Sequence, residues 1–142
     1  MSRNVDGGLL YFIKPMKVVH SSRNNCFFDQ TIKPHNDTIS VGITLTNAQA
    51  FKVDSIVLIN DDAIIGKKVT HLFTEQVKNK WNCRFFVYLT QEELSKLYTE
   101  NPPVLSFYGM ENANIQLKVK PKDWKKIREV NKAIYCQIKL NE

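Results

Sequence analysis

The segment TISVGITLT, residues 38–46, carries the clearest structural signal in this chain of 142 residues. Its apolar residues Ile39, Val41, Ile43 and Leu45 alternate with small or polar ones. A strict period of two with β-branched side chains predicts a β-strand with one buried and one exposed face. The chain therefore contains a sheet whose inner face belongs to a hydrophobic core.

Segments of the same kind flank this strand on both sides. An extended segment at residues 9–20 is interrupted by Pro15, which cannot donate to a sheet ladder, so we expect an edge strand or a break there. Turn sequences such as Asn60-Asp61-Asp62 separate the other segments. Further strands are expected at residues 26–33, 51–59, 64–74, 81–89, 104–108 and 113–120.

Two segments carry helix signals instead. Thr90 and Glu93 stand at the spacing of a capping box, which predicts a helix at about residues 91–100. Pro121 suits the first position of a second helix at about residues 121–140. One arc of this second helix is apolar and the opposite arc is cationic, which is the pattern of an amphipathic helix packed on a core.

These elements predict a mostly-β α+β fold. We expect an immunoglobulin-like β-sandwich or a partly open barrel of about eight short strands. The short inserted helix at about 91–100 and the C-terminal amphipathic helix at about 121–140 complete it. Residues 1–8 are expected to be a flexible N-terminal arm, and residues 9–142 a single domain.

Positive charge is concentrated near the end of the chain, which has a formal net charge of +6. The stretch from Lys118 to Lys139 holds eight Lys or Arg residues and two acidic ones, so it carries the whole excess. On the predicted helix these cations face away from the apolar arc. The candidate binding residues on this face are Lys122, Lys125, Lys126, Arg128, Lys132 and Lys139.

This cationic face has three interpretations. It is a solvated surface, a docking surface for an acidic protein or a neighbouring subunit, or a contact for a phosphate backbone. Arg128 alone offers the planar guanidinium used in bidentate recognition, so sequence-specific readout of a nucleic acid is not expected.

A second candidate surface lies on the predicted strand at 81–89. Arg84, Phe86 and Tyr88 alternate on one face and would form an aromatic platform able to stack bases. The alternative, which we favour, is that one of the helices covers this face.

No catalytic, cofactor or metal motif is evident. Gly66-Lys67 is preceded by Asp61 where a P-loop requires glycine. The three histidines show no mutual ligand spacing. Cys83 shares the phase of the apolar residues of its strand, which favours a buried, inert thiol. We therefore predict no catalytic residue, no cofactor and no metal site.

These observations favour a non-enzymatic structural or interaction module, a small component of a larger protein assembly of bacterial or phage origin. Its partner would be another protein or copies of itself. The alternative is a protein that binds nucleic acid non-specifically through the basic helix, and a minor alternative is an enzyme whose site is assembled from distant residues. Membrane binding is not expected, because the core needs the apolar arc of the helix.

The cysteine pattern bears on location. Cys26, Cys83 and Cys136 are odd in number and widely spaced, which argues against a disulfide framework and favours a reducing compartment. No targeting segment is recognisable. We expect a cytoplasmic protein, associated with the virion if a phage encodes it.

Overall fold

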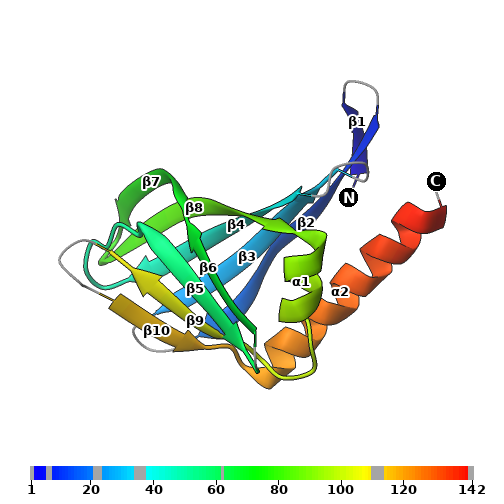
Figure 1. Cartoon of the computed structure of the whole chain (residues 1–142). Helices are drawn as coiled ribbons and strands as arrows, with labels where there is room; N and C mark the ends of the chain where they lie inside the picture. The colour runs from blue at the N-terminus through cyan, green and yellow to red at the C-terminus, as the bar shows by residue number, and fades with distance from the viewer. Residues whose placement is uncertain are drawn as a thin grey trace.

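The computed structural model describes residues 2–5, 8–20, 24–33, 38–61, 63–109 and 114–140 (Figure 1). Within these residues lie ten strands: β1 (Ser2–Val5), β2 (Gly8–His20), β3 (Asn25–Ile32), β4 (Thr38–Asn47), β5 (Ser55–Asn60), β6 (Ala63–Lys68), β7 (Thr70–Val77), β8 (Lys80–Thr90), β9 (Val104–Tyr108) and β10 (Asn114–Lys118). The same residues form two helices, α1 (Gln91–Leu97) and α2 (Pro121–Leu140).

The strands form two antiparallel sheets. Sheet A has the order β1-β2-β3-β4-β8-β7, and sheet B has the order β10-β9-β5-β6. The strand that dominates the sequence, β4, lies inside sheet A, where all four of its alternating apolar residues are buried. The predicted mostly-β α+β class is confirmed.

The first strands differ in part from the prediction. Residues 1–8 were expected to be an arm, but Ser2–Val5 pairs with the start of β2 as a hairpin, from Ser2 opposite Tyr11 to Val5 opposite Gly8. Beyond Tyr11, β3 is the only one of the described strands that pairs with β2. The register with β3 shifts between Ile13 and Met16, so the chain breaks its ladder around Pro15, as expected of a residue without an amide proton.

The predicted single strand over residues 64–74 is wrong. The chain leaves the edge of sheet B after β6, passes through Val69 alone, and becomes the edge of sheet A as β7. The amide of Val69 donates to the carbonyl of Asp54 at 3.1 Å, which anchors the crossing. Periodicity could not reveal this crossing, because a strand that changes sheets keeps its extended backbone.

Helix α1 begins at the predicted capping box. The Glu93 amide donates to Thr90 Oγ1 at 3.1 Å, and the Thr90 amide donates to Glu93 Oε1 at 3.0 Å. Its other end is held from a distant strand, because Asn60 Nδ2 at the end of β5 donates to the carbonyls of Leu97 at 2.5 Å and Asn101 at 2.9 Å. The first of these bonds satisfies a carbonyl that the helix end leaves unpaired.

Helix α2 is joined to the end of α1 by one aromatic side chain. Trp124 is fully buried, and its ring centroid lies 4.9 Å from that of Tyr98. The Trp124 indole Nε1 also donates to the carbonyl of Thr99 at 2.8 Å. An indole that is both packed and hydrogen-bonded fixes the position and the rotation of its helix.

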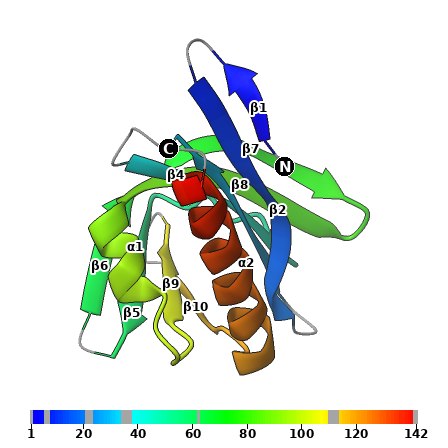
Figure 2. The ribbon, with the colours of Figure 1, turned by 90° about the vertical axis from the view of Figure 1, so that its right-hand side faces the viewer.

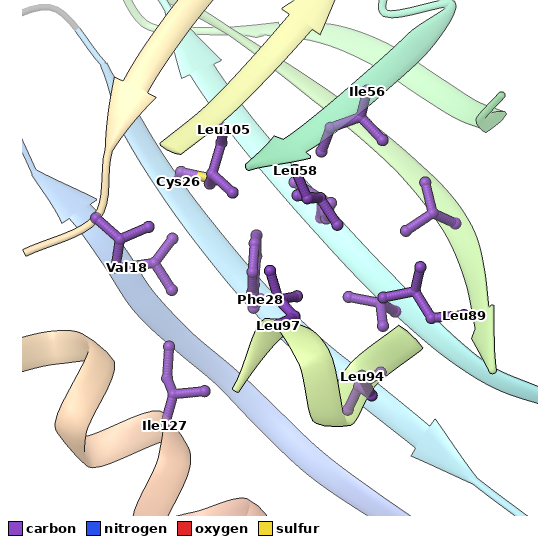
Figure 3. Close-up of a cluster of buried hydrophobic side chains, with 14 of the residues drawn as sticks. Val18, Cys26, Phe28, Ile56, Leu58, Leu89, Leu94, Leu97, Leu105 and Ile127 are labelled. Carbon is purple, nitrogen blue, oxygen red and sulfur yellow. The ribbon is translucent and has the colours of Figure 1, made fainter. Parts of the chain in front are cut away.

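The core takes side chains from every layer. Figure 3 shows Phe28 of sheet A, Leu58 and Leu105 of sheet B, Leu94 of α1 and Ile127 of α2 within one cluster. Because both helices contribute to the cluster that contains the inward residues of β3, β4 and β8, the helices and sheet B lie over the same face of sheet A (Figure 1). No helix in the described part of the chain is long and apolar enough to cross a bilayer.

We predict that Trp124→Ala lowers the free energy of unfolding by about 3–5 kcal/mol, because the change leaves a cavity between the helices and removes the bond to Thr99. Urea denaturation measures the loss. The matched control is Lys126→Ala on the exposed side of α2, which should change the value by less than about 0.5 kcal/mol. A loss below about 1 kcal/mol in Trp124→Ala would contradict the proposed role of the indole.

Candidate functional site

A groove of about 630 Å³ lies between α1 and α2, which stand side by side in both views (Figure 1 and Figure 2). Each helix lines it with residues about one turn apart. The wall from α1 consists of Gln91, Leu94, Ser95 and Tyr98, and the wall from α2 consists of Lys125, Arg128, Glu129, Asn131, Lys132 and Tyr135.

Three cations dominate the α2 wall. Lys125 and Lys132 are exposed and Arg128 is half-buried, at spacings of three and four residues that place them on one side of the helix. None of the three forms an ion pair with any residue that the structure describes. Glu129 is the one carboxylate among the described residues that line the groove. The wall is therefore electropositive.

Polar side chains lie beneath the cations. The Tyr98 hydroxyl accepts a hydrogen bond from Gln30 Nε2, which reaches it from β3. Asn131, only 3% exposed, donates through Nδ2 to the carbonyl of Ile127 at 2.9 Å and also hydrogen-bonds with Tyr98. The polar cluster Gln30, Tyr98, Asn131 and Tyr135 thus connects sheet A, α1 and α2.

This polar cluster is incompletely satisfied. Asn131 Oδ1, Gln30 Oε1 and the Tyr135 hydroxyl are buried and have no hydrogen-bond partner among the described residues. Asn131 and Tyr135 line the groove directly. A buried polar atom left unpaired costs about 1–3 kcal/mol, so the packing beneath the groove carries a local energetic cost.

Burial also perturbs the two tyrosines of the cluster. It raises the pKa of Tyr135 to about 12, because ionisation would place a charge in a poorly hydrated site. Burial likewise raises the pKa of Tyr98. The hydrogen bond with Asn131 opposes that rise, the neighbouring Tyr135 adds to it, and the bond from Gln30 opposes it. Both phenols therefore remain neutral hydrogen-bonding groups at physiological pH.

The structure divides the predicted cationic face into two parts. Lys125, Arg128 and Lys132 line the groove. Lys122 and Lys126 are exposed but are not among the lining residues. The side chain of Lys139 lies outside the described part of the chain. Cations that look equivalent on a helical wheel therefore have different surroundings.

The floor of the groove was not predicted from the sequence. Asn131 interrupts the apolar arc, four residues after Ile127 and three before Ile134, and a polar residue in that position was the available signal. Its meaning depends on Tyr98, which directly follows α1. Residues 98 and 131 meet only because α1 and α2 pack together.

The predicted aromatic platform lies on the outer face of sheet A, away from both helices. Arg84, Phe86 and Tyr88 share this face, and Tyr88 is 53% exposed, so no helix covers it as we had expected. The Arg84 guanidinium binds Asp29 through both nitrogens, at 2.8 and 3.1 Å, and its carbon lies 5.4 Å from the centroid of the Phe86 ring. Arg84 is therefore already neutralised by a partner.

Gly42 of the neighbouring strand makes that ion pair possible. A Cβ atom at this position would collide with the Asp29 carboxylate and lie 2.9 Å from Arg84 Nη2. The absent side chain lets the pair lie flat across β3, β4 and β8, where Arg84 Nη1 also donates to Thr44 Oγ1 at 3.0 Å. The outer face is therefore an ordered network with its own internal partners.

A cysteine and a histidine that are distant in the sequence meet between β7 and β8. Cys83 Sγ lies 3.9 Å from His71 Nδ1, and His71 Nε2 lies 3.4 Å from Thr74 Oγ1. Cys83 is only 3% exposed, so a substrate would have to enter the core to reach the sulfur. This arrangement fits a packed thiol better than a nucleophile.

A metal site has no support among the described side chains, which include no group of three or more His, Cys, Asp or Glu able to hold an ion. The described residues that line the groove include one carboxylate, Glu129, and no histidine or cysteine.

We predict that alkaline pH destabilises the protein in part through Tyr135. Its folded-state pKa of about 12 exceeds the unfolded value near 10, so this contribution is fully present below about pH 10 and is lost as pH rises toward 12. Urea denaturation at a series of pH values measures the free energy of unfolding of the wild type and of Tyr135→Phe, each relative to its own value at about pH 8. This free energy should fall less steeply at alkaline pH in Tyr135→Phe than in the wild type. An identical fall in the two proteins would contradict a contribution of Tyr135 to the alkaline destabilisation.

We predict that iodoacetamide labels only Cys136 rapidly in the folded protein. Cys136 is exposed, whereas Cys26 and Cys83 are buried and burial raises the pKa of the Cys26 thiol. Mass spectrometry of labelled peptides identifies the sites, and labelling in urea provides the control in which all three react. Rapid labelling of Cys83 in the folded state would instead support a nucleophilic role beside His71.

Of the surfaces described, the groove alone combines a hollow, unpaired cations and unpaired buried polar atoms. The outer face of sheet A has satisfied its charge internally, and the Cys83 sulfur is enclosed. No protein-family model matches the chain, and no curated protein or solved structure is significantly similar to it.

Proposed function

We propose that the protein is a non-enzymatic interaction module that binds an acidic segment of a partner protein in the groove between α1 and α2. The observation that carries the proposal is the α2 wall, where Lys125, Arg128 and Lys132 line a hollow without ion-pair partners among the described residues. Charge complementarity of this kind guides a partner of opposite sign and fixes its register.

The polar floor supports a binding role over a purely solvated helix. Lysines that only solubilise a surface need no hollow beside them. Beneath the cations, buried polar atoms of Gln30, Asn131 and Tyr135 lack a partner among the described residues, at a cost that a simple structural contact would avoid.

The positions of the cations favour a protein segment over a nucleic acid. Non-specific contacts with phosphates depend on the number of neutralised charges and do not require a lined groove. Here Arg128, the residue best suited to bidentate contacts, is half-buried beside Tyr98 and Tyr135. A carboxylate carried by a narrow peptide segment can reach it there more readily than a phosphate backbone.

A module of this kind would act as a small component of a larger assembly. It would hold the partner by a short segment, whereas its β-rich body would supply a rigid support for the groove. The partner would be a different protein or a second copy that offers an acidic segment, and sedimentation of the isolated protein separates these cases.

The test compares two pairs of charge reversals on the same helix. We predict that Arg128→Glu with Lys132→Glu weakens binding of fluorescein-labelled acidic peptides by at least about tenfold, because each removed charge-assisted bond contributes about 1.5–3 kcal/mol. Fluorescence anisotropy measures the binding. The matched control is Lys122→Glu with Lys126→Glu, which changes the net charge equally outside the groove and should have an effect of less than about threefold.

The same measurement with mixed-sequence DNA and RNA tests the nucleic-acid alternative. One outcome is that the wild type binds these nucleic acids at low salt and that both double charge reversals weaken this binding equally. In that case the basic helix acts by charge alone, and the nucleic-acid alternative replaces the proposal. If the two pairs weaken acidic peptides equally, the groove is not the binding site.

A further inference from the structure

An edge strand of sheet A, β7, exposes most of its length. It pairs with β8 alone among the described strands, and six of its eight residues are exposed. Leu72, Phe73 and Val77 are apolar, yet they are 45%, 41% and 44% exposed. The hairpin of β7 and β8 projects away from sheet B (Figure 2). Packing within this chain therefore does not account for the apolar side chains of β7.

The other edges carry the features that normally prevent a strand from pairing with another chain, which are short length, lysine and proline. Lys14 and Pro15 lie where β3 is the one described neighbour of β2. The strands β1 and β10 have only four and five residues, and β6 ends in two lysines. By contrast, β7 contains no lysine and no proline. Its ladder with β8 is irregular between His71 and Phe73, which leaves residues 73–77 as a regular open edge.

The side chains of this open edge follow a simple pattern. Thr74 lies opposite the buried Cys83 of β8, so Phe73, Glu75 and Val77 alternate with it and share the outer face of sheet A. A strand that joined this edge would form backbone hydrogen bonds with β7. Its own outward side chains would lie beside an apolar, an acidic and an apolar residue in turn.

Glu75 decides which kind of strand fits. It is exposed and forms no ion pair with any residue that the structure describes. If β7 of a second copy paired antiparallel with Phe73 opposite Val77, the two copies of Glu75 would lie directly opposite each other. Like charges in that position destabilise a sheet, whereas a cation opposite Glu75 would stabilise it. The complementary strand is therefore basic at its centre and belongs to another protein.

We propose that β7 accepts an antiparallel strand from a partner protein, which extends sheet A beyond its present edge. The partner segment has the order apolar, polar, Lys or Arg, polar, apolar. Its cation lies opposite Glu75, and its two apolar side chains lie opposite Phe73 and Val77. This surface shares no residue with the lining of the groove, so the inference goes beyond the proposed function.

Fluorescence anisotropy tests the inference with two fluorescein-labelled peptides, TVTRTVT and TVTETVT, which differ only in the central residue. The wild type should bind TVTRTVT at least about tenfold more tightly. Two further forms of TVTRTVT carry N-methyl groups, either on the third and fifth residues or on the fourth and sixth. Because alternate amides of a strand face the same neighbour, one form should lose at least about tenfold in affinity and the other less than about threefold.

Variants of the protein test the role of Glu75. Glu75→Lys should reverse the preference, so that TVTETVT binds more tightly than TVTRTVT. The matched control is Glu100→Lys, because Glu100 is also exposed and the change in net charge is the same. This control, and Arg128→Glu with Lys132→Glu in the groove, should change the ratio of the two affinities by less than about threefold. Urea denaturation of each variant shows that it is folded.

Several results would overturn the inference. One is that TVTRTVT does not bind the wild type, or binds it no more tightly than TVTETVT does. Another is that both methylated forms lose affinity equally, which means that the peptide does not bind as a strand. A wild-type dimer in sedimentation that Phe73→Lys abolishes would show that a second copy occupies β7. In all these cases the binding of acidic peptides to the groove remains a separate measurement, so the proposed function stands or fails independently.

Discussion

The packing of Trp124 against the end of α1 is the contact on which the proposed site depends. Its ring covers Tyr98 and its indole nitrogen binds the Thr99 carbonyl, so α2 is held at a defined distance and rotation beside α1. The end of α1 is in turn held by Asn60, which donates to Leu97 from the last position of β5. A groove between two helices keeps its shape only when both walls are held, and these contacts hold them from the core side.

The groove concentrates features that folding alone does not favour. Natural cores pair nearly all of their buried polar atoms, yet three unpaired atoms from Gln30, Asn131 and Tyr135 surround Tyr98. Three cations above them also lack ion pairs among the described residues. Local costs of this kind often mark sites where stability is exchanged for function. By contrast, Arg84 on the outer face of sheet A is paired with Asp29.

The edges of the two sheets explain why the groove lies at one end of the body. Sheet B and the helices share the inner face of sheet A, and each covers the part that the other leaves open (Figure 1). The crossing at Val69 carries the chain from one sheet to the other with a single residue, which keeps the two edges together on the side of β6 and β7. The helices pack over the part of sheet A that sheet B leaves open, and the groove lies between them.

Much of the fold could be predicted from the sequence, because it depends on interactions between residues that are close in the chain. The alternation in Thr38–Asn47, the capping box at Thr90 and the whole of Pro121–Leu140 are set by periodicity and by hydrogen bonds between near neighbours, so the sequence alone determined them. The cationic stripe of α2 followed from the same periodicity. Tertiary structure decided what no local pattern encodes: the change of sheet at Val69, the meeting of Tyr98 with Asn131, and the separation of groove cations from outer ones. Those depend on contacts between residues distant in the chain, whose partners are chosen by packing of the whole core.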